Sequence, residues 1–196
     1  MKTYLFIDGT NLYASQYELF GPQKYLNFSK FIKEVEKKIK VKFNKIYFYA
    51  SYSPRPKRLN KKQALYLKNE GLFYKSVRET KNVSFFKGYR SKTSGKEKEV
   101  DVKLAVDVVD FAHLGVYSHL YLLSGDADFI QALEVVKRLK KKVYVLCIEN
   151  KFMFRSLISF PVFVISFIGK ELRIKGIKKR PKMLYIDPND VGSKVE

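Results

Sequence analysis

Short apolar runs alternate with segments of helical spacing along most of the chain. Residues 3–8 (TYLFID) form the kind of continuous apolar run that is found in buried parallel strands. Runs of similar character predict further strands, and residues 72–79 are also predicted to be extended. The predicted strands are residues 3–8, 44–51, 83–90 (at a sheet edge), 119–125, 141–148 and 163–166.

Helical periodicity separates these strands. Apolar residues at helical spacing between Phe28 and Ile39 predict a helix over residues 26–40, with Asn27 or Ser29 as its cap. A basic helix is expected to stop at Gly71. The predicted helices after the first are residues 58–71, 99–115, 128–140 and a short one at 153–158.

Strands that alternate with helices predict one α/β domain, a three-layer sandwich whose central sheet is mainly parallel and is covered on both faces. We expect this domain to occupy residues 1–173 of the 196. The polar segment at 90–98 reads as a loop inside it. Residues 174–196 are basic and contain two prolines, which predicts a C-terminal tail or an arm on the surface.

The net charge and its distribution along the chain indicate what kind of partner the protein binds. The chain carries a net charge of +20 and has a pI near 9.8, with 46% apolar residues. Residues 51–98 contain fourteen Lys or Arg against three Glu, whereas residues 99–134 contain seven acids and one Lys. Clustering of this kind favours nucleic acid over a membrane as the partner. A Lys-rich composition that serves only solubility or thermal stability is the alternative.

Several other classes of protein are excluded or disfavoured. One cysteine, Cys147, allows neither a disulfide framework nor a cysteine metal cluster, and two histidines give little support to a zinc site. Asp8 interrupts the first apolar run too early for a signal peptide. The apolar segment 157–169 contains a proline and is too short to span a bilayer. We therefore expect a soluble cytoplasmic protein with no membrane partner.

Carboxylates follow two of the predicted strands. Asp8 ends the first strand, and Asp126 and Asp128 come directly after residues 119–125. Ligands of open parallel sheets bind at the carboxyl ends of the strands. We therefore expect these acids to lie together at that edge of the sheet, which we call the rim. Asp101, in the first turn of its helix and above an apolar stripe, is expected to face the same rim.

Four converging carboxylates repel one another unless a cation lies between them. Oxygen ligands suit Mg²⁺ or Mn²⁺, and with a nucleic-acid partner they indicate phosphodiester hydrolysis through Asp8, Asp101, Asp126 and Asp128. The alternative is that the acids after the strands are turn residues or helix caps.

Neighbouring polar residues have open roles. Asn11 is a cap of the helix that follows it, or it orients Asp8 or a metal-bound water. Ser124 hydrogen-bonds a carboxylate or fills a tight turn. Asp107 and Asp110 are predicted on a solvated helix face, away from Asp101.

A belt of basic residues with interleaved aromatic residues precedes the acids. Charge beside rings suits single-stranded RNA, in which phosphates meet the charge and unstacked bases meet the rings. Most of these aromatic residues could equally be packed in the core, and Tyr52 and Tyr89 are the ones expected to be exposed. The nucleic-acid-binding residues are predicted to be Lys57, Arg58, Lys61, Lys62, Arg78, Lys87 and Arg90.

Three motifs contain these acids: FIDGTNLY at 6–13, KEVDVKLAVDVV at 98–109 and LLSGDADFIQAL at 122–133. Together they resemble the NYN domain, the group of PIN-like ribonucleases that includes the LabA-like proteins. The resemblance implies a PIN-like fold and a centre dependent on Mg²⁺ or Mn²⁺ that usually acts on RNA. Asp8, Asp101, Asp126 and Asp128 match the acids of the motifs, and Asn11 and Ser124 match supporting positions. Asp107 matches an acid without an assigned role. PIN-like nucleases often form dimers, so the resemblance also allows a homodimer.

Two functions therefore compete. The first is a metal-dependent endoribonuclease, in which the basic surface binds the RNA backbone. The second is an RNA-binding or regulatory module whose acidic site is inactive or vestigial.

Overall fold

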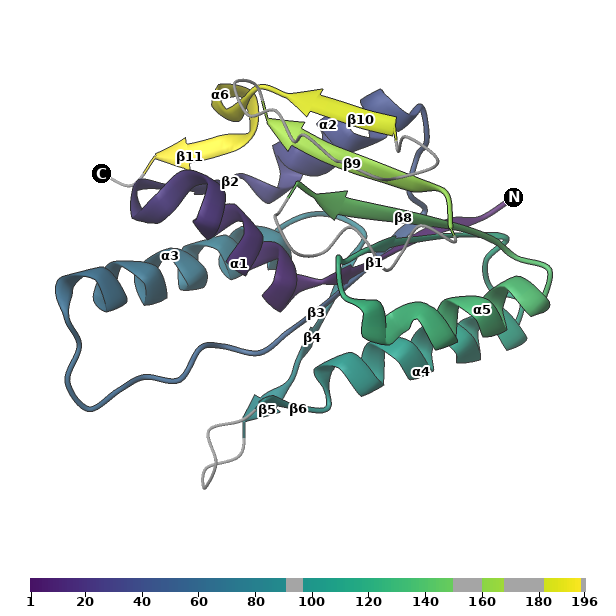
Figure 1. Cartoon of the computed structure of the whole chain (residues 1–196), viewed down its shortest axis with the longest axis horizontal. Coiled ribbons are helices and arrows are strands. Elements are labelled where there is room, and N and C mark those ends of the chain that lie inside the picture. Colours follow the sequence, from purple (N-terminus) through teal and green to yellow (C-terminus); the bar gives the residue numbers. More distant parts are fainter. Residues whose placement is uncertain (91–96, 150–159, 168–181, 195–196) are drawn as a thin grey trace, which may run out of the picture.

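A parallel sheet of seven strands forms the centre of the computed structural model, which describes residues 1–90, 97–149, 160–167 and 182–194 (Figure 1). All six neighbouring pairs in this sheet run parallel. The strand order is β10-β9-β8-β7-β1-β3-β4. The strands are β1 (Thr3–Asp8), β3 (Lys45–Ala50), β4 (Val83–Lys87), β7 (His119–Leu123), β8 (Lys142–Ile148), β9 (Val162–Phe167) and β10 (Lys182–Ile186).

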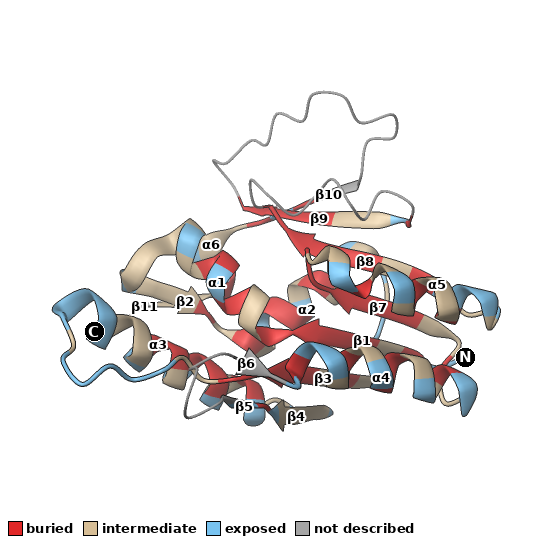
Figure 2. Cartoon of the chain, turned by 60° about the horizontal axis from the view of Figure 1, so that its bottom comes forward, coloured by how far each residue is buried: buried red, intermediate tan, exposed pale blue. Residues whose placement is uncertain are grey.

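Helices cover both faces of this sheet, as the alternating pattern predicts. One apolar core lies between the sheet and α1, α2 and α3, and a second lies between the sheet and α4 and α5. Figure 2 shows the strands buried along most of their length and the outer helix faces exposed. The helices are α1 (Gly9–Phe20), α2 (Phe28–Ile39), α3 (Lys61–Arg78), α4 (Val100–His113) and α5 (Ile130–Arg138). The predicted α/β sandwich is confirmed.

Local signals account for two of the helix starts. The Asn27 side chain accepts from the Lys30 amide at 3.1 Å and so caps α2, which leaves Ser29 inside the helix. Asn60 and Gln63 form a reciprocal capping box at the start of α3. Among the described helices, none has both the length and the apolar content needed to cross a bilayer.

Helix α3 differs from the prediction. It continues through Gly71 to Arg78, so the predicted stop at Gly71 and the extended segment 72–79 are wrong. Phe73, Tyr74 and Val77 lie at helical spacing and are fully buried against the sheet. Their burial outweighs the cost of about 1 kcal/mol for a glycine inside a helix.

The C-terminal segment is part of the fold where the structure describes it. Residues Lys182–Ile186, predicted within a tail or arm, form β10 and pair in parallel with β9. After α6 (Pro188–Val191), β11 (Gly192–Lys194) pairs antiparallel with β2 (Lys24–Leu26), which follows the 3₁₀ turn η1 (Gly21–Gln23). The segment MLYID carries the usual apolar strand signal, which its basic surroundings concealed.

Two predictions fall mainly outside the described residues. The loop at 90–98 is described only at its ends, where β5 (Tyr89–Arg90) and β6 (Glu97–Lys98) pair antiparallel. The short helix at 153–158 lies entirely outside the described ranges.

Candidate active site

Asp8 lies where β1 ends and α1 begins, at the position where the strand order reverses. Its side chain is 4% exposed. One carboxylate oxygen, Oδ1, accepts from the Asn11 amide at 3.0 Å, and the other, Oδ2, accepts from the Ser124 hydroxyl at 3.0 Å. Asp8 is therefore the N-cap of α1, and the interpretation of Asn11 as the cap is wrong. The reversal of strand order is where α/β sheets bind ligands.

Glycine is required directly after Asp8. A Cβ atom added at Gly9 would lie 2.1 Å from Cε1 of the Phe48 ring on β3. Because Phe48 is fully buried in the core, its ring has little room to move. The Asp-Gly pair thus lets α1 start close against the neighbouring strand and keeps the Asp8 carboxylate at the rim.

Ser124 connects Asp8 to the acids that follow β7. The Ser124 hydroxyl donates to Asp8 and also accepts from the Asp126 amide at 3.1 Å. The Asp126 side chain in turn accepts from the Asp128 amide at 2.9 Å, which caps the 3₁₀ turn η2 (Ala127–Phe129). Of the two readings of Ser124, the hydrogen bond to a carboxylate is therefore the one observed.

Residues from all three motifs affect the pKa of the Asp8 carboxyl group. Burial is the main cause that raises the pKa of Asp8 from 3.8 to about 7. The carboxylates of Asp101 and Asp126 raise this pKa further, whereas the hydrogen bonds from the Asn11 amide and the Ser124 hydroxyl lower it. Residues far apart in the sequence thus act on one buried carboxyl group.

The four predicted acids differ in exposure. Asp8 is buried, Asp126 is half-buried, and Asp101 and Asp128 are exposed. Asp101 lies in the first turn of α4, where the helix dipole favours a negative charge. Within the described residues, no three His, Cys, Asp or Glu side chains are grouped closely enough to hold a metal ion. The donor chemistry suits Mg²⁺ or Mn²⁺, but the described side chains do not form a closed set of ligands.

Asp107 does not lie on a solvated face as predicted. It is 8% exposed, accepts from the Tyr49 hydroxyl at 2.8 Å, and accepts from Lys103 Nζ at 2.5 Å. Tyr49 is paired with Asp8 in the register of β3 and β1, so this network adjoins the site. The spacing from Leu104 to Asp107 places both residues on one helix face, which was the signal available in the sequence. Asp110 is exposed, as expected.

A further acid, Glu149, was missed by the sequence interpretation. It directly follows β8, is 5% exposed, and its Oε2 atom has no hydrogen-bond partner within the described part of the chain. By strand alternation it lies on the same sheet face as Cys147, which is opposite Val164 on β9. Its place immediately after an apolar strand is the same signal that identified Asp8.

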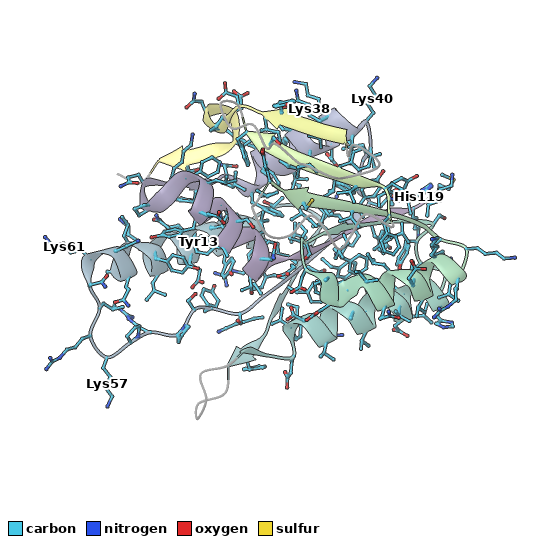
Figure 3. The ribbon with its side chains drawn as sticks, viewed as in Figure 1. Tyr13, Lys38, Lys40, Lys57, Lys61 and His119 are labelled. Atoms are coloured by element: carbon cyan, nitrogen blue, oxygen red, sulfur yellow. The ribbon has the colours of Figure 1, made fainter. Side chains whose placement is uncertain are left out.

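The predicted basic residues fall into two groups. Lys57 and Arg58 in the β3–α3 loop, and Lys61 and Lys62 in the first turn of α3, are exposed; Figure 3 shows Lys57 and Lys61 extending away from the ribbon. The second group lies beside Tyr52, whose hydroxyl accepts from Arg78 Nη1 at 2.9 Å and whose ring lies 5.3 Å from Lys87 Nζ.

The remaining belt residues differ in what the structure describes. The Arg90 side chain lies outside the described residues. Of the two rings expected to be exposed, Tyr89 is 72% exposed, whereas Tyr52 is half-buried against Tyr74.

Comparisons with known proteins agree with this fold. The crystal structure of a protein of unknown function from Vibrio parahaemolyticus superposes with a TM-score of 0.59 and 20% identity, covering 84% of this chain and 91% of that chain. A search among curated proteins found no match. The model of the NYN domain matches residues 2–166, which span all three motifs and the acids at the sheet rim. The chain therefore belongs to the NYN domain family, whose PIN-like members are typically nucleases.

Proposed function

We propose that the protein is a metal-dependent endoribonuclease that hydrolyses RNA phosphodiester bonds at the rim around Asp8. The observation that carries this proposal is that carboxylates from three motifs meet where the strand order reverses. Asp8 is buried there, which is the main cause of its raised pKa, and Asp101 and Asp126 lie close enough to raise this pKa further. A helix cap alone requires only a hydrogen-bond acceptor, which an uncharged Asn or Ser supplies equally well. The concentration of negative charge therefore favours a site that binds a cation.

Asp8, Asp101, Asp126 and Asp128 are the residues that would hold Mg²⁺ or Mn²⁺. When bound, the ion supplies a water of lowered pKa and stabilises the negative charge that develops at phosphorus. The chain's own hydrogen bonds orient Asp8, because the Asn11 amide and the Ser124 hydroxyl each donate to a different carboxylate oxygen. Ser124 also accepts from the Asp126 backbone amide, so one hydroxyl links the Asp8 carboxylate to the backbone that carries Asp126.

RNA is the proposed substrate because the loop that leaves β3, the strand beside that of Asp8, carries exposed basic residues. Phosphate contacts from Lys and Arg supply most of the affinity for a nucleic-acid backbone. The exposed Lys57, Arg58, Lys61 and Lys62 lie in the loop that leaves β3 and in the helix start that follows, next to the strand that carries Asp8. The basic surface thus binds the strand, and the acidic rim cuts it.

The first experiment compares wild type with Asp126→Asn on a panel of single- and double-stranded RNAs in Mg²⁺, Mn²⁺ or chelator. The side-chain oxygen of the substituted asparagine can still accept from the Asp128 amide, so the turn is kept while the charge is removed. We expect metal-dependent cleavage in the wild type and a loss of at least about 100-fold in the variant, with RNA affinity nearly unchanged. Asp110→Asn, which neutralises an exposed acid on α4, is the matched control and should cleave normally. Cleavage that survives in Asp126→Asn would reject the assigned centre.

The second candidate is an RNA-binding module with an inactive acidic site. Two observations favour it: Asp8 and Asp126 both serve as helix caps, and no closed set of metal ligands is present among the described side chains. Replacing Lys61 and Lys62 together with Ala should then weaken RNA binding, whereas Asp8→Asn should leave RNA binding intact. RNA binding without cleavage in every metal condition would favour this candidate.

A further inference from the structure

A cavity of about 330 Å³ lies between α1, the β3–α3 loop and the start of α3. Its walls are mostly apolar and include Tyr17, Tyr66, Leu67, Pro54 and Pro56, with Lys62 at the side. This volume is at the lower end of the range for small-ligand pockets, which suits a single flat ring system. No residue of the acidic rim lines the cavity, so the cavity is separate from the site described above.

The aromatic wall is held in place from behind. The Tyr17 and Tyr66 rings meet edge to face with their centroids 4.7 Å apart, and Tyr13 contacts Tyr66 in the same way at 5.0 Å. The Tyr13 hydroxyl also donates to the Tyr66 carbonyl at 2.8 Å, which ties α1 to α3. Tyr13 is labelled in Figure 3, where it lies between these two helices. The wall is therefore preorganised, which lowers the entropic cost of binding a flat ligand.

The opposite wall is anchored by a buried carboxylate. Glu70, which is 2% exposed, accepts from the Ser53 hydroxyl at 2.6 Å and from the Ser53 amide at 3.0 Å. These bonds fix the start of the loop, so that Pro54 and Pro56 lie against the cavity. Each proline also restricts its own backbone.

The cavity lies beyond the same ends of the strands as Asp8, because α1 and the β3–α3 loop both start there. Tyr17 lies nine residues after Asp8 along α1, which corresponds to about 13 Å of helix axis. The loop begins beside the start of this helix, since the Ser51 amide donates to the Thr10 hydroxyl at 3.4 Å. With a rise of about 3.4 Å per stacked nucleotide, a few nucleotides span this distance.

One exposed cation lines the cavity, and others are close to its lining residues in the sequence. Lys62 lines it, Lys61 precedes Lys62 in the first turn of α3, and Lys57 and Arg58 follow the two prolines in the loop. Aromatic rings next to such charge are the combination that binds single strands, because the rings stack with bases while the cations contact phosphates.

We propose that this cavity is a base-binding subsite that receives one unstacked base of a single-stranded nucleic acid whose backbone runs from the loop toward Asp8. The assignment of RNA as the natural strand rests on the function proposed above, but base capture itself does not require cleavage. The subsite makes the substrate a single strand or a loop, because a base held in a duplex is not free to enter.

The subsite is expected to accept different bases. Ser53 donates its hydroxyl to Glu70, and Gln63 uses its side-chain oxygen to accept from the Asn60 amide. The Ser53 hydroxyl and the Gln63 side-chain oxygen are thus engaged within the protein, and stacking on the rings accepts any base because every base offers a ring face.

The test measures binding of a fluorescent ten-nucleotide single-stranded RNA in chelator, so that no cleavage occurs. We expect Tyr17→Ala to weaken binding by at least about fivefold, the lower end of the effect of losing one stacked base, and Tyr17→Phe to remain within about twofold of wild type. Tyr185→Ala removes a half-exposed ring on β10, at the far edge of the sheet, and should change nothing. If Tyr17→Ala folds poorly, Tyr17→Leu keeps apolar bulk against Tyr66 and gives the same readout.

A ten-nucleotide strand made wholly of abasic nucleotides tests base capture, because a subsite that accepts any base lets an ordinary strand bind in several registers. In wild type, this strand should bind more weakly than ordinary RNA by at least the factor lost in Tyr17→Ala, and in Tyr17→Ala the difference should be smaller. An abasic strand that binds wild type as tightly as ordinary RNA, or an abasic effect of the same size in the variant, would overturn the subsite. The same comparison in single-stranded DNA should retain the effect of Tyr17, because stacking does not depend on the sugar.

Failure of the subsite and failure of the proposed nuclease are distinguishable. Base-dependent binding without cleavage in Mg²⁺ or Mn²⁺ would keep the subsite and reject the nuclease. Cleavage that depends on Asp126, with RNA affinity indifferent to Tyr17, would keep the nuclease and reject the subsite.

Discussion

The raised pKa of Asp8 predicts how the stability of the protein depends on pH. In the folded protein this carboxyl group titrates near pH 7, whereas its ordinary value is 3.8. Between these values the folded state binds a proton that the unfolded state has released. The stability that this proton contributes is fully present below pH 3.8 and is lost as the pH rises through 7.

The magnitude follows from the two values. A difference of this size corresponds to about 4 kcal/mol over the full range, and about 2 to 3 kcal/mol of it is lost between pH 5 and pH 8. Asp8→Asn removes the titration and keeps the acceptor for the Asn11 amide. The Ser124 hydroxyl already accepts from the Asp126 amide and has a second lone pair for the new amide group.

The assay is urea unfolding of wild type and Asp8→Asn in chelator at pH 5, 6, 7 and 8. We expect the free energy of unfolding of Asp8→Asn, relative to wild type, to rise by about 2 to 3 kcal/mol from pH 5 to pH 8. For a chain of this length, that is a relative shift in Tm of about 5 to 10 °C. Asp110→Asn, at an exposed position, is the control and should show no such trend. A difference between Asp8→Asn and wild type that is constant across the four pH values would refute the raised pKa.

Metal supplies a second readout on the same proteins. A cation that binds the ionised site stabilises the folded state by about 2.7 kcal/mol at a concentration 100 times its Kd. Wild type at pH 8 should therefore regain stability in Mg²⁺ or Mn²⁺, whereas Asp8→Asn should regain much less. Equal stabilisation of both proteins would show that the ion binds elsewhere.

Three further predictions test other parts of the site. Tyr49→Phe deprives the buried Asp107 carboxylate of its hydroxyl donor and should lower the free energy of unfolding by about 1.5 to 3 kcal/mol, measured with urea. Gly9→Ala places a methyl group into a buried ring on β3 and should cost about 1 to 3 kcal/mol or more, and an unchanged Tm would contradict the close packing. Replacing Lys61 and Lys62 with Ala should make the dependence of log K on log salt for single-stranded RNA shallower by about 1.4, and an unchanged slope would exclude phosphate contacts there.

The fold could be predicted from the sequence because its strands are short continuous apolar runs, and such runs are typical of strands with both faces of the sheet covered. The errors lie where tertiary contacts outweigh a local signal. Gly71 is a helix stop in isolation, but the burial of Phe73 and Tyr74 carries α3 past it. Residues Lys182–Ile186 carry an apolar strand signal that their basic surroundings conceal, and they form a strand by pairing with β9.

The site was predictable only in part, for a related reason. Asp8 and Asp126 can be identified because each follows an apolar strand. The bond between Ser124 and Asp8 joins residues 116 positions apart and depends on β7 lying beside β1. Asp107 is buried beside Tyr49 on β3, whose hydroxyl donates to its carboxylate. The sequence around Asp107 does not reveal this partner.

The coexistence of helix caps and a charged rim bears on which function is correct. Asp8 and Asp126 cap helices, and this role explains their positions without any metal. It does not explain their charge, because an Asn at either position would accept the same amide without repelling the neighbouring carboxylates. Asp8 is in addition buried, so that its ionisation opposes folding near neutral pH. A residue that costs stability where a neutral one would serve is best explained by a bound cation that offsets the repulsion. Measuring whether Mg²⁺ restores that stability therefore decides, before any RNA is added, whether the carboxylates around Asp8 bind a cation, and the cleavage assay then decides whether that site is active.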